Sequence, residues 1–497
     1  MSSNNKQTYI KKDLRQHIYD TPDTYAGGSD MISEFLPIFN NESQQIEFKE
    51  IEYIPVLYNM FNEILVNARD QKVRLESDKG SEQVSTIKVS YQDGIWSIYN
   101  DGQGILIEKH KQEKIYNPEL IFGRLLTSSN YNKDEKKIVG GKNGYGAKIT
   151  NIFSTKFEIE TCDHITKQKY VQTFSNNMKT IEKPIITKSK RKPYTKITWE
   201  TDFKRFNISG FTDDMVSLMI RRVYDISGIT DNKLNVYFND KKLPIKSFTN
   251  YIELYPSSST KIYEKLSDRW ELSVGVSQND KFEHISFVNG IATPKGGIHV
   301  DTIVKQITSM VSAYIKKKHK KEVPEKYVKN YISLYLNSVI ENPSFDSQTK
   351  ERLITPKSKF GSKPELNEKF IKKICDSGLS EKVLQFTDFK ENTLTKKTNG
   401  VKKSKLRDIP KLDDANFAGT RKAHLCTLIL TEGDSAKSMA VAGLSVVGRN
   451  LYGVFPLKGK VLNVRDAPIK QIVANQEITN LKKIIGLESG KKYKDVK

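Results

Sequence analysis

The feature that most constrains this chain is a pair of glycine-rich turns, at residues 100–104 (Asn-Asp-Gly-Gln-Gly) and 142–148 (Lys-Asn-Gly-Tyr-Gly-Ala-Lys). The second turn directly precedes an apolar run with helical spacing, which includes Ile149 and Ile152. Glycines let a backbone approach a phosphate closely, and a helix N-terminus offers free N–H groups and a positive dipole end. The pattern therefore predicts a phosphate-binding turn, with an ordinary turn before a helix as the alternative.

Composition narrows the classes of partner. The 497 residues carry 81 Lys and Arg against 59 Asp and Glu, a net charge of +22, and length alone predicts roughly two to four domains. Such a charge suits duplex DNA, although a soluble basic protein would have it too. Three widely spaced cysteines predict neither a disulfide framework nor a zinc site. Without a signal peptide or a membrane-spanning apolar run, we expect an intracellular protein with no membrane partner.

An amphipathic helix is predicted from Pro55 to Gln71, because its apolar residues recur at helical spacing. Glu63, Asn67 and Asp70 lie along one side of it, at i, i+4 and i+7. Two interpretations stay open for this stripe. It is either a solvated polar face, or a carboxylate base, a magnesium-binding amide and a second acid lining a nucleotide pocket.

The chain on either side of the first glycine turn has β character. Residues 86–99 alternate apolar and polar around Gln92-Asp93-Gly94, which predicts a hairpin that ends at Asn100. Asn100 is then placed either to contact a base edge or simply to form a turn. Strands at Tyr194–Thr201 and Leu234–Phe238 and a helix at Met215–Ile226 would complete an α/β layer.

These pieces occur in one order, Glu-x-x-x-Asn on a helix, then Asn-Asp-Gly-x-Gly, then Asn-Gly-x-Gly. In this order, and in the wording of residues 61–68, 126–131 and 140–148, the sequence resembles the GHKL ATPase superfamily and, within it, eukaryotic-type (type IIA) DNA topoisomerase II. The resemblance implies an α/β (α+β) fold: a GHKL Bergerat ATPase sandwich with an N-terminal strap (1–241) and a ribosomal protein S5-like transducer (242–398). A linker (399–422) and the N-terminal part of a Rossmann-like TOPRIM domain (423–497) would follow.

The resemblance also implies roles for the residues of the first domain. Glu63 would be the general base, Asn67 would hold Mg²⁺ and Asn100 would bind adenine. The family usually has arginine where this chain has Lys142, so the charge is kept but a bidentate phosphate clamp is lost. The further ATP contacts would come from a lid with Ser128, Ser129 and Asn130 and from the wrap formed by Lys142, Asn143, Gly144, Tyr145, Gly146, Ala147 and Lys148.

The implied transducer begins near Lys242. A strand over Ile285–Ile291 and a glycine turn precede a predicted helix that ends near Ile315. In the family a lysine-rich loop follows here and contacts DNA, whereas such runs are commonly just solvated surface. The family's Gln-Thr-Lys segment is matched at Gln348 and Lys350, which would sense and stabilise the γ-phosphate. The implied DNA contacts are Lys316, Lys317, Lys318, Lys320 and Lys321.

The last part of the chain resembles the start of a TOPRIM domain. Leu425–Leu430 is an apolar run typical of buried strands, and Thr431-Glu432-Gly433-Asp434 follows it. Glu432 would be an Mg²⁺ ligand for DNA cleavage, with Lys458 and Lys460 near DNA. A further Asp-x-Asp pair and the domain with the DNA-attacking tyrosine do not appear. We therefore expect either a shortened chain or an enzyme whose cleavage domains lie in a second chain.

The resemblance thus implies an ATPase arm, with ATP and Mg²⁺ as cofactors, that forms an ATP-dependent homodimer around a DNA duplex. The alternative is a GHKL clamp of the chaperone or mismatch-repair type, which closes on nucleotide without cutting DNA. Glu432-Gly433-Asp434-Ser435-Ala436 argues against that alternative. Short loops and a Lys-, Asn- and Ile-rich composition favour a protist or a large DNA virus as the source. The location would then be the nucleus, or a cytoplasmic virus factory or virion.

Overall fold

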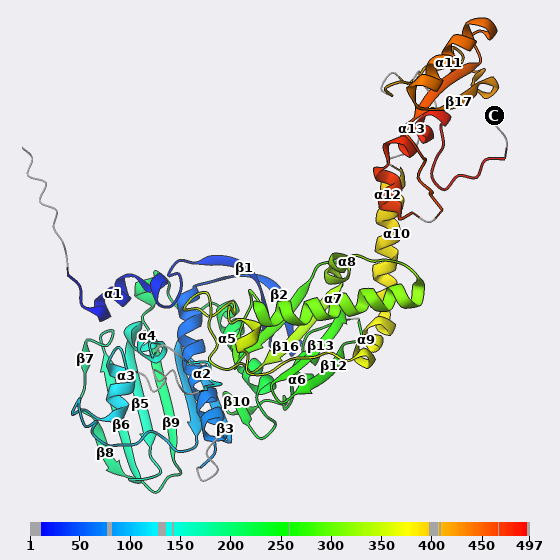
Figure 1. Ribbon diagram of the computed structural model, residues 1–497. Helices are drawn as coiled ribbons and strands as arrows, with labels where there is room; N and C mark the ends of the chain where they lie inside the picture. The colour runs from blue at the N-terminus through cyan, green and yellow to red at the C-terminus, as the bar shows by residue number, and fades with distance from the viewer. Residues whose placement is uncertain are drawn as a thin grey trace, which may run out of the picture. The chain divides into compact units, whose positions relative to one another are not determined.

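The computed structural model describes residues 11–76, 82–127, 136–141, 144–257, 259–396, 406, 409–465 and 467–494 (Figure 1). The chain divides into two compact units, Met1–Leu379 and Ser380–Lys497. Five of the predicted ATP contacts lie outside the described residues: Ser128, Ser129, Asn130, Lys142 and Asn143.

A nine-stranded sheet forms the first part of the larger unit. Its strand order is β11-β10-β3-β4-β9-β5-β6-β7, with β8 paired to β6, and only the β10–β3 pairing is parallel. The predicted hairpin is confirmed, because β3 and β4 are joined through Asp93 and Gly94, both with positive φ. The strands are β3 (Thr86–Gln92), β4 (Ile95–Asp101), β5 (Ser154–Cys162), β6 (Gln168–Ser175), β7 (Thr180–Ile181), β8 (Ile185–Lys188), β9 (Tyr194–Thr201), β10 (Asn235–Phe238) and β11 (Lys241–Lys242).

The predicted amphipathic helix is α2 (Pro55–Glu76), which continues five residues beyond Gln71. Its apolar side packs on the nine-stranded sheet, where the rings of Phe61 and Trp96 lie 4.6 Å apart and both side chains are buried. Burying an aromatic side chain of this size stabilises the fold by about 2–3 kcal/mol, so this face fixes how α2 lies on the sheet.

Further helices complete this layer. The helix α4 (Gly146–Ile152) packs beside α2, and α5 (Asp213–Ile229), which contains the predicted 215–226 helix, packs against α2 and a separate hairpin of β1 (Ile32–Asn40) and β2 (Gln45–Tyr53). Phe39 of β1 stacks on Tyr224 of α5 with ring centroids 4.0 Å apart. The shorter helices are α1 (Leu14–Asp20), α3 (Asn117–Gly123) and α6 (Phe248–Glu253).

A five-stranded sheet forms the second part of this unit, in the order β12-β13-β16-β14-β15, with the long helix α7 (Ile298–His319) lying along it (Figure 1). The strand expected over Ile285–Ile291 is interrupted, because Asn289 and Gly290 have positive φ and turn the chain from β14 into β15. The other elements are β12 (Ile262–Ser267), β13 (Trp270–Val276), β14 (Glu283–Val288), β15 (Ile291–Ala292), β16 (Ile332–Ser338), α8 (Glu325–Asn330) and α9 (Glu368–Ile374).

The smaller unit contains a parallel pair, β17 (Thr427–Glu432) and β18 (Tyr452–Leu457), with α11 (Gly433–Val447) packed on both strands. The expected burial of the Leu425–Leu430 run is wrong for the described residues: Leu430 is 45% exposed and Leu425 53%. The apolar strand has a hydrogen-bonding neighbour on one edge only among these residues, so α11 and β18 cover it incompletely. The other helices are α10 (Ser380–Lys396), α12 (Ile469–Ala474) and α13 (Gln476–Ile485). No helix among the described residues is both long enough and apolar enough to cross a membrane.

Candidate active site

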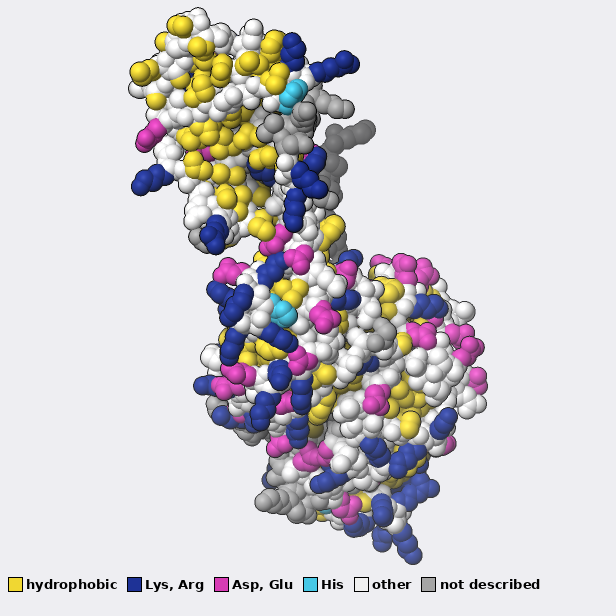
Figure 2. All heavy atoms as spheres, turned by 90° about the vertical axis from the view of Figure 1, so that its right-hand side faces the viewer, with side chains coloured by type: hydrophobic (Ala, Val, Ile, Leu, Met, Phe, Trp, Pro, Cys, Tyr) yellow, Lys and Arg dark blue, Asp and Glu magenta, His cyan; other side chains and the backbone are white. Residues whose placement is uncertain are grey.

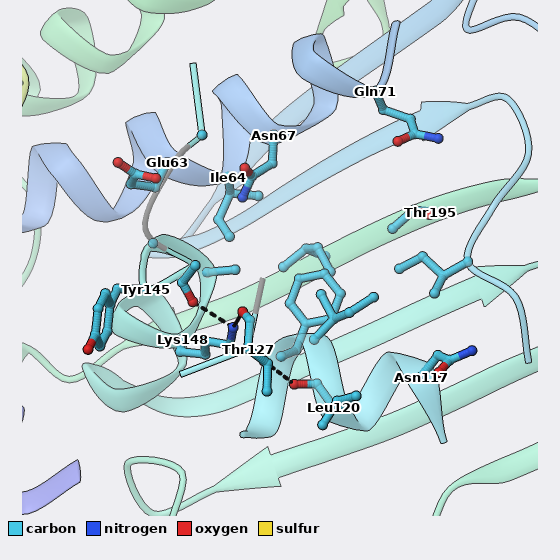
Figure 3. Close-up of a pocket in the computed structure, with 18 of the residues that line it drawn as sticks. Glu63, Ile64, Asn67, Gln71, Asn117, Leu120, Thr127, Tyr145, Lys148 and Thr195 are labelled. Carbon is cyan, nitrogen blue, oxygen red and sulfur yellow. Dashed lines mark hydrogen bonds between the residues drawn. The ribbon is translucent and has the colours of Figure 1, made fainter. Parts of the chain in front are cut away.

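A cavity of roughly 870 Å³ opens in the larger unit beside α2 (Figure 3). Its walls come from α2, the ends of β4 and β9, the chain between β4 and α4, and a segment that follows β16. Ten of the predicted site residues line this one cavity: Glu63, Asn67, Asn100, Gly144, Tyr145, Gly146, Ala147, Lys148, Gln348 and Lys350. Segments nearly 300 residues apart in the sequence therefore meet here.

The polar side of α2 forms one wall. Figure 3 shows Glu63, Asn67 and Gln71 projecting from this helix, one turn apart. Their spacing of four residues stacks them along the helix axis, so a carboxylate and two amides face the same cavity. The carboxylate can act as a base, and carboxylate and amide oxygens can both hold a hard cation such as Mg²⁺.

Asp70, the third residue of the predicted stripe, fits neither interpretation of it. The side chain is fully buried and is not part of the cavity wall. Its two carboxylate oxygens accept hydrogen bonds from the N–H groups of Gly140 and Gly141, at 3.0 and 2.7 Å, and Arg69 Nη1 lies 3.7 Å away. Burial raises the pKa of the Asp70 carboxyl, while the arginine and the two N–H groups act in the opposite direction. Asp70 thus holds the chain that leads into the glycine turn.

An ion pair joins the two parts of the larger unit inside the cavity. Lys350 Nζ donates to Glu63 Oε1 at 2.6 Å, and the two side chains are only 8% and 20% exposed. Lys350 is delivered by a tight turn, in which its N–H donates to the Ser347 carbonyl and its own φ is +60°. Gln348, in the same turn, also lines the cavity. A cation and a carboxylate from distant segments therefore share the position where a reacting group would bind.

The glycine turn approaches Glu63 more closely than any larger residue allows. A Cβ atom at Gly146 would lie 2.1 Å from Glu63 Oε2, well inside van der Waals contact. Gly144 has a φ of +69°, which also favours glycine. The two glycines therefore let the start of α4 lie directly against the carboxylate, as the sequence pattern requires of a cradle for phosphates.

Lys148 is held at this cradle by two backbone carbonyls. Its Nζ donates to the carbonyl oxygens of Thr127 and Gly144, each at 2.5 Å. The Lys148 side chain is buried, and this burial lowers the pKa of its ammonium to about 8. A negative phosphate group beside it would favour the protonated form.

Asn100 lies at the end of β4, where the hairpin prediction put it. The side chain is 7% exposed, and its Nδ2 donates to the Asp101 carbonyl at 2.8 Å. Asp101 in turn accepts from the N–H groups of Ser85 and Thr86, which fixes the end of the strand. Asn100 is therefore a strand residue rather than part of the turn that follows, and it lines the cavity. Its contact with a base stays a prediction.

Sequence reasoning missed part of the wall. The chain between β4 and α4 supplies several polar residues whose spacing forms no recognisable motif. The helix α2 supplies Gln71, which could have been predicted because it continues the four-residue spacing of Glu63 and Asn67. These residues are His110, Gln112, Asn117, Thr127 and Gln71.

The predicted DNA contacts of the larger unit are placed differently from the expected loop. α7 continues through the lysine run as far as His319, and Lys320 ends it with a φ of +54°. Lys316 pairs with Glu322 at 2.7 Å and Lys318 with Asp376 at 3.4 Å, whereas Lys317 and Lys320 are exposed and Lys321 is partly buried. Figure 2, which views the side where α7 ends, has acidic side chains interspersed among the basic ones.

The remaining predicted residues lie in the smaller unit, outside the cavity. Glu432, at the end of β17, is exposed, as are Lys458 and Lys460. The backbone N–H of Lys458 donates to the Glu477 carboxylate. No group of three or more His, Cys, Asp or Glu side chains that could hold a metal occurs within the described residues, so the metal role of Glu432 stays a prediction.

Residues 237–401 match the family model described as DNA gyrase B. The chain is 47% identical to DNA topoisomerase 2 of Arabidopsis thaliana over 502 residues, which cover 99% of this chain and 34% of that protein. It is 45% identical to the Saccharomyces cerevisiae enzyme over 509 residues, covering 98% of this chain and 35% of that protein. The chain thus spans about a third of the length of these relatives.

Solved structures of topoisomerase II are also similar to this chain. The crystal structure of the ATPase region of Saccharomyces cerevisiae topoisomerase II superposes with a TM-score of 0.72 at 43% identity, over 76% of this chain and 98% of that one. The ATPase and transducer domains of DNA topoisomerase II from Balamuthia mandrillaris give a TM-score of 0.73 at 39% identity, over 77% and 98%. The predicted α/β (α+β) fold of the GHKL type is confirmed by these neighbours. Because the sequence identity extends over 98% of each of these two solved structures, this chain belongs to the DNA topoisomerase II family.

Proposed function

We propose that this chain is the ATP-hydrolysing arm of a type II DNA topoisomerase, whose nucleotide-driven dimerisation captures a DNA duplex for strand passage. The observation that carries this proposal is the pairing of Lys350 with Glu63 in a cavity that also contains a glycine cradle. A cation positioned from one part of the unit, a carboxylate from another and backbone N–H groups between them are the components that phosphoryl transfer requires.

The cavity suits ATP in size and in the chemistry of its walls. Asn100 would bind the adenine, and Gly144 to Lys148 would surround the triphosphate with backbone N–H groups and one ammonium. The close approach of Gly146 to Glu63 supports this fit, because it leaves the cradle and the acid side by side. Asn67 would hold Mg²⁺ through its amide oxygen, and the ion would neutralise charge on the phosphates. Ser128, Ser129, Asn130, Lys142 and Asn143 are proposed as further ATP contacts from the sequence resemblance.

Hydrolysis then depends on an exchange of partners at Lys350. While its ammonium is bonded to Glu63, Oε1 of this carboxylate is occupied by Lys350 and is not available to a water molecule. A γ-phosphate competes for Lys350 and, together with Gln348, draws this turn toward the nucleotide. Glu63 is then free to orient the attacking water and accept its proton, while Lys350 stabilises the negative charge that develops on the phosphoryl group.

The same exchange couples hydrolysis to motion. ATP would bridge α2 and the chain after β16, and loss of the γ-phosphate would remove that bridge and allow the two parts to rotate. In the homodimer this motion would open or close a gate around DNA, with the α7 lysines as contacts to its phosphates. Glu432, Lys458 and Lys460 are proposed to serve the DNA-cleaving part of the enzyme. We propose the nucleus as its location, or a virus factory if the source is viral.

A direct experiment separates the two levels of the proposal. We would measure steady-state ATP hydrolysis and nucleotide-dependent dimerisation of the chain, with and without duplex DNA at low salt. Hydrolysis that DNA stimulates, together with a dimer that forms only with a non-hydrolysable ATP analogue, supports the arm. Hydrolysis without either response would leave an ATPase but remove the topoisomerase arm.

A further inference from the structure

A short segment connects the cavity to the five-stranded sheet. Residues 136–141, which we call the return segment, end at Gly141 in the cavity wall, three positions before Gly144 of the glycine turn. The return segment is held at consecutive points along its length by side chains from both parts of the unit. Because it leads into the phosphate cradle, whatever holds it also sets where the cradle begins.

The first point of attachment is Asn342, which follows β16. Its backbone N–H donates to the Lys137 carbonyl at 2.8 Å, and its side-chain Oδ1 accepts from the Lys137 N–H at 3.1 Å. Asn342 has a φ of +44°, a conformation that asparagine, aspartate and glycine tolerate best. Next to this pair, Lys136 and Glu341 form an ion pair at 3.4 Å. The segment after β16 thus holds the near end of the return segment through both backbone and side chain.

The second point is Asn289, in the turn between β14 and β15. This side chain is fully buried. Its Nδ2 donates to the carbonyls of Val139 and Ile340, at 3.3 and 2.8 Å, and its Oδ1 accepts from the Ile340 N–H at 2.8 Å. One amide therefore ties the hairpin turn, the chain after β16 and the return segment together, and a buried amide with this many partners is costly to disrupt.

The far end of the return segment is held by α2. Asp70 accepts from the N–H groups of Gly140 and Gly141, as described above. Gly140 itself is packed so closely that an added Cβ would lie 3.0 Å from the side chains of both Ile291, in β15, and Val66, in α2. The return segment is therefore clamped between the helix that carries Glu63 and the sheet whose following chain carries Lys350.

We propose that Asn342 and Asn289 are positioning residues of the nucleotide site, which hold the return segment in register so that the phosphate cradle is formed. The chain after β16 then acts on the cavity twice: directly through Lys350, and indirectly through Asn342 and the return segment. This inference rests on the proposed ATPase function. It predicts that nucleotide affinity depends on an asparagine that neither lines the cavity nor contacts the nucleotide.

The test compares three variants of the full chain. Asn342→Gly removes the acceptor for the Lys137 N–H but keeps the backbone conformation, whereas Asn342→Asp keeps an acceptor oxygen at the same place. Asn207→Gly is the matched control, because Asn207 is also exposed and left-handed, with a φ of +55°, but caps a turn after β9. Losing one such hydrogen bond should raise KM for ATP by about threefold to tenfold in Asn342→Gly, with kcat unchanged.

Hydrogen exchange of the nucleotide-free protein gives a second readout, which needs no ATPase activity. Amides of residues 136–141 should exchange faster in Asn342→Gly than in the wild type, while Asn342→Asp and Asn207→Gly keep wild-type exchange and wild-type KM. Equal KM and equal exchange in Asn342→Gly and the wild type would overturn the inference. A rise in KM shared by Asn342→Asp or Asn207→Gly would overturn it as well, because the effect would not follow the acceptor oxygen. A wild-type chain that neither binds nor hydrolyses ATP would instead refute the proposed function, and the exchange comparison would still test the attachment.

Discussion

Lys350 Nζ and Glu63 Oε1 lie 2.6 Å apart although the two residues are 287 positions apart in the sequence. The contact places the positive end of one segment on the carboxylate of another, inside a cavity lined by glycines and amides. Because removing one partner of a poorly exposed ion pair leaves the other uncompensated, each residue constrains the state of its partner. We propose that the ion pair is a resting contact, which the γ-phosphate of a bound nucleotide would replace.

Removing the cation should impair chemistry more than binding. We expect Lys350→Met to lower kcat for ATP hydrolysis by about 10²- to 10³-fold, because a donor aimed at developing charge is lost. Lys295→Met is the matched control. Lys295 pairs at 2.5 Å with Glu351, the residue that directly follows Lys350, but the Lys295 side chain is 60% exposed. Steady-state kinetics would decide the matter. Equal kcat values for the two variants would contradict the role given to Lys350.

Adding one carbon to the glycine turn should abolish nucleotide binding. In Gly146→Ala the new Cβ would meet Glu63 Oε2 at 2.1 Å, so either the acid or the start of α4 has to move. Gly210→Ala makes the same change where no atom lies within 4 Å, and it should behave as the wild type. Calorimetric titration with a non-hydrolysable ATP analogue measures the effect. Wild-type affinity in Gly146→Ala would show that the cradle does not need this close approach.

Nucleotide binding should take up a proton near pH 8. Burial lowers the pKa of Lys148 to about 8, so the free protein loses this charge as the pH rises through that value, whereas bound phosphate favours the protonated form. KM for ATP should therefore rise from about one unit below this pKa to about one unit above it. Titrations in two buffers of different ionisation enthalpy report the proton directly. Binding without proton uptake in the wild type, or with the same uptake in Lys148→Met, would contradict this assignment.

The lowered pKa of Lys148 also affects stability: raising the pH should weaken ATP binding but increase the free energy of unfolding. An unfolded lysine keeps its proton up to about 10.5, whereas folded Lys148 loses it near 8. Between these values the unfolded chain binds more protons, so the contribution of Lys148 to the free energy of unfolding rises with pH. Replacing Lys148 by Met should remove this part of the pH dependence, as measured by denaturant unfolding across the same range.

DNA binding should depend on two exposed lysines of the α7 lysine run for which the described residues provide no ion pair. Lys317 and Lys320 are exposed, while Lys316 and Lys318 are already engaged with acids. The double substitution Lys317→Gln and Lys320→Gln should weaken DNA binding and reduce the steepness of its salt dependence, because fewer counterions are released. Lys241→Gln and Lys242→Gln, in the exposed strand β11, form the control pair. Unchanged salt dependence in the α7 variant would place the DNA contacts elsewhere.

The local patterns of the sequence predicted much of the fold. The apolar spacing of α2 and the alternation around Asp93-Gly94 were sufficient for a helix and a hairpin. These features are encoded within a few residues, by periodicity and by turn chemistry. That Glu63, Asn67 and Asn100 line one cavity was expected only from the family resemblance. The pairing of Lys350 with Glu63 could be anticipated only from family resemblance, since no local rule connects such distant segments.

The sequence-based predictions were wrong where contacts between distant segments determine burial or secondary structure. Asp70 has the same spacing as its two polar neighbours on α2, yet it is buried because the return segment offers it two N–H donors. The apolar run at β17 predicts burial, but an apolar composition does not supply the neighbours that would cover it. In the family the lysine run lies in a loop, whereas here the helix propensity of lysine lets α7 continue as far as His319.

The central claim is that Glu63 activates water in an ATPase cavity, and Glu63→Gln tests it most directly. The substitution keeps the size of the side chain and removes its basicity, so ATP turnover should fall by about 10²- to 10⁴-fold. Affinity for a non-hydrolysable ATP analogue should be retained, because the glycine cradle and Lys148 are untouched. Single-turnover hydrolysis measured beside this binding assay gives both quantities on one preparation. Hydrolysis at the wild-type rate in a Glu63→Gln protein that binds the analogue normally would contradict the account.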